Sequence, residues 1–318
     1  MTGKEFSVNT STDFVLEPGT LITGRWRGGK YKVKRLLGQG ANGVVYLVQT
    51  PGRPESYALK MGYDTIDLQS EINVLKALQF QSHGRGIPSA SSYLVEVDDY
   101  RMKDQKIPFY VMRYIKGEPL SFFVARKGAD WLGLAGLSLL RQLRKLHESG
   151  WVFGDLKPEN VLVSPYGEAE LIDYGGVSLI GRSVKQFTEW YDRGFWNAGS
   201  RSADEAYDWF AFSVVCIHLL AGSELKAAAR GLPQVRSVQD LLAIVDKVPR
   251  LAPYAGWLKS GLTGKFSTTT EACLRWEQTI RKPSVRKTLA TPRWLSRAFI
   301  LSLVLLGCAL YWHIRYLL

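Results

Sequence analysis

Alternating apolar and polar residues, the pattern of β-strands, recur through the first third of the chain. The chain turns strand-like from Leu21, where T-G-R-W-R-G-G-K indicates a turn-rich hairpin. Further strands are predicted near residues 31–37, 44–48, 57–60, 92–97 and 109–112. The polar sequence D-D-Y-R-M-K-D-Q-K between the last two is expected to be a connecting loop. Residues 1–20 read as a flexible polar lead-in, with no apolar stretch that would indicate a signal peptide.

Apolar residues spaced by three and four predict helices elsewhere. The run E-I-N-V-L-K-A-L from Glu71 has this spacing, and so do the leucines of residues 134–147, where His147 is expected to be structural rather than catalytic. The sequences S-V-Q-D from residue 237 and T-T-T-E from residue 268 resemble capping boxes of later helices.

The last apolar run, Ala298 to Ile314, has seventeen residues without a formal charge. As a helix it would be about 25 Å long, close to the lower limit for crossing a bilayer. We predict a transmembrane helix over 298–314 and a short exterior tail over 315–318. A buried terminal helix is the alternative, although such a helix would have a polar face.

Composition adds a net charge of +12 and three widely spaced cysteines, which fit neither a disulfide framework nor a zinc site. Positive charge favours partners that carry phosphate. Two runs, Arg25–Arg35 and Arg281–Arg297, each hold six basic residues and no acid. The second run, directly before the apolar helix, predicts a cytoplasmic flank, so the globular part is placed on the inner face of the membrane.

A glycine-rich motif, Gly38-x-Gly40-x-x-Gly43, lies between two predicted strands. Glycines allow the backbone to approach phosphates closely, because no Cβ intervenes. A dinucleotide-binding motif would open a helix after the third glycine, but the residues that follow are β-branched and aromatic. The motif therefore predicts a loop that covers nucleotide phosphates from a β-hairpin.

The sequence Trp151 to Asn160, W-V-F-G-D-L-K-P-E-N, carries an acid, a lysine and an amide at the spacing of a phosphoryl-transfer loop. Asp155 would accept the proton of a substrate hydroxyl, Lys157 would meet the transferred phosphoryl group, and Asn160 would bind Mg²⁺. Farther on, L-I-D-Y-G places Asp173 at the end of a short strand, where a second magnesium ligand is expected.

With these motifs in this order, the sequence resembles the bacterial Hanks-type serine/threonine protein kinases. The phrases F-G-D-L-K-P-E-N, D-Y-G-G and E-W-Y-D-R-G-F-W resemble the membrane-anchored YabT-like group of spore-forming bacteria, which implies a role in sporulation. The resemblance implies an α+β, two-lobed fold: kinase domain 21–282, N-lobe 21–113, C-lobe 114–282, basic juxtamembrane linker 283–297. It implies Mg·ATP as cosubstrate and serine or threonine hydroxyls of proteins, including its own, as acceptors. Homodimer formation is left open.

The same resemblance assigns further nucleotide-site residues. Lys60, held by Glu71, would bind the α- and β-phosphates. The adenine would be enclosed by apolar walls and by the connection between the lobes, which gives the following set: Leu37, Val45, Ala58, Met112, Tyr114 and Leu162.

Departures from the family pattern are also informative. Phe153-Gly154-Asp155 replaces the usual H-R-D, so the arginine that binds a phosphorylated activation loop is missing, and activity is expected not to depend on that phosphate. The A-P-E motif is absent, which leaves the partner of Arg281 open. Asp208 is expected to support the catalytic-loop backbone. Thr188, Ser178 and Ser183 are candidate autophosphorylation sites.

Other classes of protein account for this sequence less well than a kinase. A membrane-tethered pseudokinase or a DNA-binding module without turnover would usually have lost Lys60, Asp155 or Asp173, and all three are present. A small-molecule phosphotransferase shares a related loop, but the glycine motif and K-P-E-N argue against it. The basic runs predict binding of a polyanion, either acidic lipid headgroups, which we favour for Arg281–Arg297, or DNA.

Overall fold

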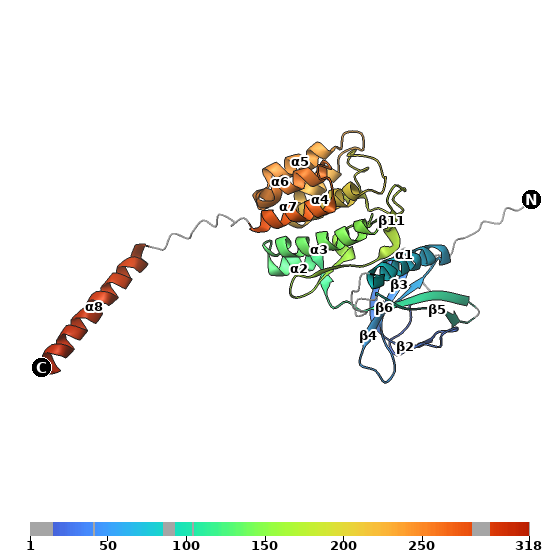
Figure 1. Ribbon diagram of the computed structural model, residues 1–318, viewed down its shortest axis with the longest axis horizontal. Coiled ribbons are helices and arrows are strands. Elements are labelled where there is room, and N and C mark those ends of the chain that lie inside the picture. The colour runs from blue at the N-terminus through green and yellow to red at the C-terminus, as the bar shows by residue number, and fades with distance from the viewer. Residues whose placement is uncertain (1–14, 41, 85–92, 104, 282–292, 318) are drawn as a thin grey trace, which may run out of the picture. The chain divides into compact units, whose positions relative to one another are not determined.

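The computed structural model describes residues 15–40, 42–84, 93–103, 105–281 and 293–317 (Figure 1). The chain divides into two compact units, Met1–Thr279 and Ile280–Leu318. The predicted boundary between catalytic domain and linker, at 282–283, lies outside the described residues and stays a prediction.

Six antiparallel strands of the first unit form one sheet within the described residues, in the order β1-β2-β3-β4-β6-β5. Their bounds are β1 (Leu21–Thr23), β2 (Lys30–Gly40), β3 (Gly43–Gln49), β4 (Ser56–Gly62), β5 (Leu94–Met102) and β6 (Gln105–Arg113). Helix α1 (Thr65–Gly84) packs beside this sheet and begins six residues before Glu71 (Figure 1).

The prediction of a loop between the last two of these strands is wrong. The polar sequence instead forms the ends of β5 and β6, which pair as far as Met102 and Gln105. The polar residues are tolerated because Asp98, although buried, accepts hydrogen bonds from the backbone N–H groups of Trp26 and Arg27 at 2.9 and 2.7 Å. Burial would raise the pKa of Asp98, but these backbone donors outweigh it and lower the pKa.

Period-two alternation gives the sheet two different faces. One face carries a closed apolar cluster: Ile22, Tyr31, Val33, Val44, Tyr46, Val48, Leu59, Met61, Ile107, Phe109 and Val111. The residues between these, including Val45 and Lys60, point to the opposite face. The functional residues of the sheet therefore lie on the face away from this cluster.

Helices dominate the rest of the first unit: α2 (Leu120–Lys127), α3 (Trp131–Glu148), α4 (Glu205–Ala229), α5 (Val238–Lys247), α6 (Ala255–Leu262) and α7 (Thr269–Arg281). Short strands form two small sheets, β10-β9-β7 and β11-β8: β7 (Glu118–Pro119), β8 (Trp151–Val152), β9 (Val161–Val163), β10 (Ala169–Leu171) and β11 (Ser178–Leu179). Short 3₁₀ helices complete it: η2 (Pro158–Asn160), η3 (Tyr174–Gly176), η4 (Glu189–Tyr191) and η5 (Pro249–Tyr254). This arrangement confirms the α+β, two-lobed fold.

The helical core is built around Trp276, which is fully buried. Its ring stacks on Tyr254 and meets Phe212 and Trp257 edge-on, with all three centroids near 5 Å. The predicted capping box at Ser237 is confirmed, since the Asp240 carboxylate accepts from the Ser237 N–H. At Thr268 only half of the box forms: its hydroxyl accepts from the Glu271 N–H, while the Glu271 carboxylate binds the Ser267 N–H.

Two helices of the described residues are long and apolar enough to cross a membrane. One is α4, whose apolar window is mostly buried in the core. The other is α8 (Arg293–Leu317), whose window 297–316 has a mean hydropathy of 1.7 and no buried residue. It extends the predicted span 298–314 by a few residues at each end. The apolar side chains of α8 are exposed, whereas the alternative, a buried terminal helix, would have them covered.

Candidate active site

The side of the sheet opposite the apolar cluster collects the expected nucleotide residues. Register places Val45 opposite Lys60, and Lys60 opposite Tyr110. Ala58 lies two residues from Lys60 and opposite Met112, so these side chains share one face. Val45 and Met112 are half-buried, and Ala58 is buried. An apolar wall beside a buried ammonium suits a group with a flat apolar part and phosphates.

The glycine motif forms the turn between β2 and β3, where Gly40 pairs with Gly43. Gly43 has a φ of +145°, and a Cβ there would lie 2.0 Å from the Met61 carbonyl oxygen, so the fold itself requires this glycine. Around Gly38 and Gly40 a Cβ would meet nothing within 4 Å. That open space leaves their backbone accessible to a ligand. The register shifts between Leu36 and Gly38, which leaves Leu37 unpaired and half-buried at the irregularity.

Lys60 lies between two carboxylates. Its Nζ is 2.7 Å from Glu71 Oε2 on α1 and 2.9 Å from Asp173 Oδ1. Burial alone would lower the pKa of Lys60, but the two carboxylates outweigh it and raise the pKa. Conversely, burial would raise the pKa of Asp173, and the ammonium lowers it below its ordinary value. Burial raises the pKa of Glu71 even beside this ammonium, so the surroundings favour the charged forms of Lys60 and Asp173 in particular, and the Asp173 side chain is still 42% exposed.

Glu71 also receives a hydrogen bond at 3.0 Å from the backbone N–H of Tyr174, the residue after Asp173. One carboxylate on α1 thus fixes both the lysine of β4 and the start of η3. Asp173 itself has a left-handed backbone (φ 62°), a conformation that non-glycine residues adopt at a cost and that often marks functional sites. The buried Tyr174 ring packs edge-on against Phe153 of the catalytic loop, at 6.0 Å.

The catalytic loop, residues 153–160, brings Asp155, Lys157 and Asn160 together. Lys157 Nζ donates to Asp155 Oδ2 at 2.7 Å, and Asn160 Nδ2 donates to the Asp155 backbone oxygen at 2.9 Å and to Oδ2 at 3.2 Å. Thr188, from a segment 33 residues away, donates to Asp155 Oδ1 at 2.8 Å and accepts from Lys157 at 3.1 Å. The Asp155 carboxylate is therefore held in one orientation by three side chains.

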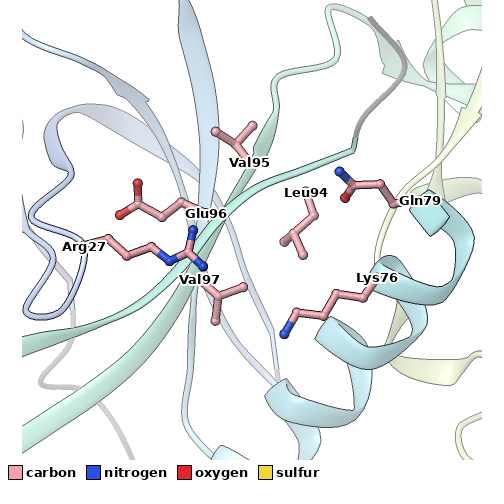
Figure 2. A pocket seen from close by; sticks show the side chains of 7 residues that line it. All are labelled: Arg27, Lys76, Gln79, Leu94, Val95, Glu96 and Val97. Carbon is pink, nitrogen blue, oxygen red and sulfur yellow. The ribbon is translucent and has the colours of Figure 1, made fainter. Parts of the chain in front are cut away.

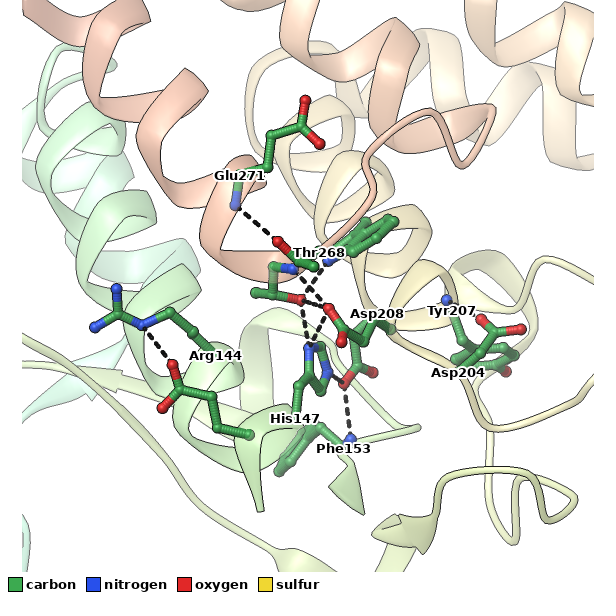
Figure 3. A network of polar contacts seen from close by, with 12 residues as sticks. Arg144, His147, Phe153, Asp204, Tyr207, Asp208, Thr268 and Glu271 are labelled. Carbon is green, nitrogen blue, oxygen red and sulfur yellow. Dashed lines mark hydrogen bonds and ion pairs between the residues drawn. The ribbon is translucent and has the colours of Figure 1, made fainter. Parts of the chain in front are cut away.

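Asp208 supports the backbone of the catalytic loop, as predicted. The buried carboxylate on α4 accepts from the N–H groups of Phe153 and Gly154, at 2.7 and 3.0 Å, and lies 2.8 Å from His147 Nε2 (Figure 3). The other ring nitrogen of His147 lies 2.6 Å from Thr269 Oγ1. His147 thus joins α3, α4 and α7 behind the loop, which confirms its structural role.

Gly154 explains the missing arginine of the usual H-R-D. Its φ is +80°, and a Cβ at this position would lie 2.8 Å from the Gly176 carbonyl oxygen. A side chain there would be strained and would push the catalytic loop away from η3. The local backbone thus favours glycine over an arginine.

The residues expected to bind magnesium fit that role chemically. The amide nitrogen of Asn160 is used as a donor to Asp155, which leaves its oxygen as the atom for a cation. Asp173 supplies a partly exposed carboxylate. The described residues contain no group of three or more His, Cys, Asp or Glu side chains that could hold a metal. One carboxylate and one amide match Mg²⁺, which usually takes few protein ligands plus phosphates and water.

The remaining predicted residues lie at the edge of this arrangement. Tyr114 follows β6 in the connection to β7 and is half-buried. Leu162 is half-buried on β9, opposite Pro119 of β7. The hydroxyl of Ser178 is buried and donates to the Gly176 oxygen, so no phosphate reaches it in this conformation, whereas Ser183 is exposed.

Sequence reasoning missed two contributors. Tyr110, fully enclosed on β6, hydrogen-bonds Glu71, and burial followed by the Glu71 charge raises its pKa far above the ordinary value. Thr188 was named only as an autophosphorylation candidate, yet its hydroxyl is bonded to Asp155. Register with Lys60 could have indicated Tyr110, whereas no spacing signal indicates Thr188.

A hollow of about 420 Å³ lies outside this site, between α1 and β5 (Figure 2). Lys76 and Gln79 of α1 form one side of it, and residues 94–97 of β5 with Arg27 form the other. It contains none of the predicted nucleotide or catalytic residues.

Comparison with known proteins extends this picture. Residues 31–284 match the family described as "Protein kinase domain". Serine/threonine-protein kinase YabT of Bacillus subtilis is 38% identical over 264 residues, which cover 82% of this chain and 75% of that protein. Among solved structures, the Mycobacterium tuberculosis PknI kinase domain is similar with a TM-score of 0.53 at 23% identity, covering 83% and 99% of the two chains. Vaccinia related kinase 3 has a TM-score of 0.58 at 17% identity, covering 84% and 90%.

Proposed function

Because this chain belongs to the protein kinase domain family and is a protein serine/threonine kinase, we propose that Lys60, Asp155, Asn160 and Asp173 form its catalytic centre. The observation that carries the proposal is the double contact of Lys60 with Glu71 and Asp173, beside an Asp155 fixed by Lys157 and Thr188. Together they join β4, α1 and the catalytic loop into one charged site.

Each of these residues has a distinct role in the proposed reaction. Lys60, held by Glu71, binds the phosphates of ATP, while the turn at Gly38 and Gly40 covers them. Asn160 and Asp173 hold Mg²⁺, which when bound neutralises charge on the phosphate oxygens. Asp155 orients the acceptor hydroxyl and takes its proton, and Lys157 faces the transferred group. Positioning and charge supply the catalysis, because the transferred phosphoryl group needs little covalent help.

Incubation of the full-length chain with γ-labelled radioactive ATP, Mg²⁺ and a protein acceptor tests this function. We expect label on serine and threonine after acid hydrolysis, in the acceptor and in the kinase itself, and no label with a chelator. A pseudokinase scaffold, the alternative from another class, would bind ATP and leave the acceptor unlabelled.

Helix α8 is proposed to anchor the kinase in the cytoplasmic membrane, with the catalytic domain on the cytoplasmic side. An exposed apolar helix with Arg297 and Arg315 near its two ends supports the anchor, and the larger number of basic residues on its N-terminal side supports this orientation. Lys282, Arg286 and Lys287 of the flanking basic run lie outside the described residues.

Charges placed in the middle of α8 should release the protein from membranes. Each arginine at the helix centre costs about 2.5–3.5 kcal/mol of insertion free energy, so Leu303→Arg with Leu306→Arg should shift the chain from the membrane pellet to the alkaline-soluble fraction. The paired control, Leu303→Ala with Leu306→Ala, should stay in the pellet. Membrane retention of the arginine pair would contradict the anchor.

A basic face of the sheet supports binding of a polyanion. Lys30, Lys32 and Lys34 alternate with the buried Tyr31 and Val33, so all three ammonium groups lie on the exposed side of β2. The exposed Arg25, stacked on Trp26 at 4.7 Å, extends this face. We propose that it binds phosphate-rich surfaces and thereby regulates the kinase.

Gel-shift assays of the full-length chain on DNA, and flotation with anionic or neutral vesicles, test this proposal across salt. Affinity should fall steeply as salt rises, because binding releases counterions. The triple variant Lys30→Gln, Lys32→Gln, Lys34→Gln should weaken binding and flatten the salt dependence. Absence of binding to both DNA and anionic vesicles at low salt would end the proposal.

A further inference from the structure

Four consecutive residues, 185–188, contact both sides of the active site from the activation segment, the stretch between η3 and α4. Lys185 Nζ donates to Ser70 Oγ on α1 at 2.7 Å. Gln186 Oε1 accepts from Asn42 Nδ2, at the turn of the glycine motif, at 3.2 Å. The first two residues therefore contact the two N-lobe elements that carry Glu71 and the phosphate-covering backbone.

The next two residues contact the C-lobe. The Arg201 guanidinium lies 4.0 Å from the centre of the Phe187 ring, and Arg201 also pairs with the buried Asp192. Thr188 is the residue whose hydroxyl donates to Asp155. The segment thus touches the α1 helix and the catalytic carboxylate within four residues of chain.

The backbone from which Lys185 projects is itself fixed. Its N–H donates to Ser178 Oγ at 3.2 Å, and the preceding Val184 N–H donates to the Arg201 oxygen at 2.9 Å. Val184 is buried in a cluster with Val152, Ala203 and Tyr207. The backbone of Lys185 is therefore fixed by the C-lobe, although its side chain is exposed.

We propose that Lys185 is a positioning residue for phosphoryl transfer, a role that rests on the proposed function above. Its bond to Ser70 holds the turn of α1 that carries Glu71, and Glu71 in turn holds Lys60 and the Tyr174 N–H. Unmodified side chains thereby hold residues 185–188 against both the N-lobe helix α1 and the catalytic loop of the C-lobe. These contacts align α1 with the catalytic loop in a kinase that has Gly154 in place of the arginine that would bind a phosphorylated activation loop.

The contact is solvent-exposed, so its loss should change activity moderately. A single hydrogen bond from an ammonium shifts an equilibrium between aligned and misaligned α1 by a factor of about 5–20. We expect Lys185→Met to lower kcat about 5- to 20-fold with the KM for ATP changed less than kcat. Lys185→Arg, which keeps a donor, should retain most activity.

The test measures kcat, KM for ATP and thermal midpoint for five full-length variants: Lys185→Met, Lys185→Arg, Ser70→Ala, the double variant Ser70→Ala with Lys185→Met, and the control Arg182→Met. Arg182 is an exposed cation of the same segment. Because Ser70 and Lys185 act as one contact, the double variant should be no slower than the slower single variant. Thermal midpoints should stay close to that of the wild type.

The inference would be overturned by a Lys185→Met variant as active as wild type, by multiplicative losses in the double variant, or by equal losses in Arg182→Met. Activity lost in proportion to the thermal midpoint would also overturn it, since that indicates a merely structural role. If the wild-type chain transfers no phosphate, the proposed function fails instead, so the two failures are distinguishable.

Discussion

Asp155→Asn should lower kcat for phosphoryl transfer about 10²- to 10⁴-fold, the range expected when a positioned general base is lost. The asparagine keeps the shape of the side chain and can still accept from Lys157 or Thr188, but it cannot take the proton of the acceptor hydroxyl. The measurement is the initial rate of label transfer from ATP to a protein acceptor at saturating ATP.

Nucleotide affinity of Asp155→Asn provides the control, because Asp155 lies outside the Lys60–Glu71–Asp173 cluster. Binding of a fluorescent ATP analogue should match the wild type within a few fold. Equal transfer rates in the variant and the wild type would remove Asp155 from the catalytic centre.

Asp173→Asn is expected to have the second-largest effect, a loss of about 10²- to 10³-fold, typical for removal of one electrostatic stabiliser of a transition state. The change removes a charged ligand for Mg²⁺ and one of the two carboxylates that Lys60 contacts. With less negative charge beside it, the pKa of Lys60 should move down. Rates measured across a magnesium titration should show a higher half-saturating concentration.

Glu168→Gln is a matched control for this prediction, since it removes a carboxylate from an exposed position five residues away. It should behave as wild type in the same titration. If Asp173→Asn had an unchanged magnesium dependence, the assignment of Asp173 as a metal ligand would be wrong.

Local patterns predicted what depends on neighbouring residues. The glycine turn, the lysine within β4 and the acid two residues after β10 follow from strands and turns that short stretches of sequence specify. The role of Asp208 was predicted correctly from the family pattern, and the structural role of His147 from its place near the end of a predicted helix. The two-lobed α+β fold was predicted from the same motifs.

Contacts between distant segments were not predictable in this way. The polar stretch that became β5 and β6 reads as a loop, because Asp98 finds its backbone partners some 70 residues earlier in the chain. The bond from Thr188 to Asp155 joins two C-lobe segments 33 residues apart, and the hydrogen bond between Tyr110 and Glu71 joins a strand to a helix within the N-lobe. The reason for glycine at 154 appears only when the Gly176 carbonyl is seen beside it.

The central claim is that Lys60, Asp155 and Asp173 form one site that moves a phosphoryl group from ATP to a protein hydroxyl. A single-turnover experiment tests it most directly, with the full-length chain in excess over γ-labelled radioactive ATP and Mg²⁺. We predict that label appears on serine or threonine at the rate at which ATP disappears. Bound ATP that stays intact, or is released as free phosphate without labelled protein, would contradict the claim.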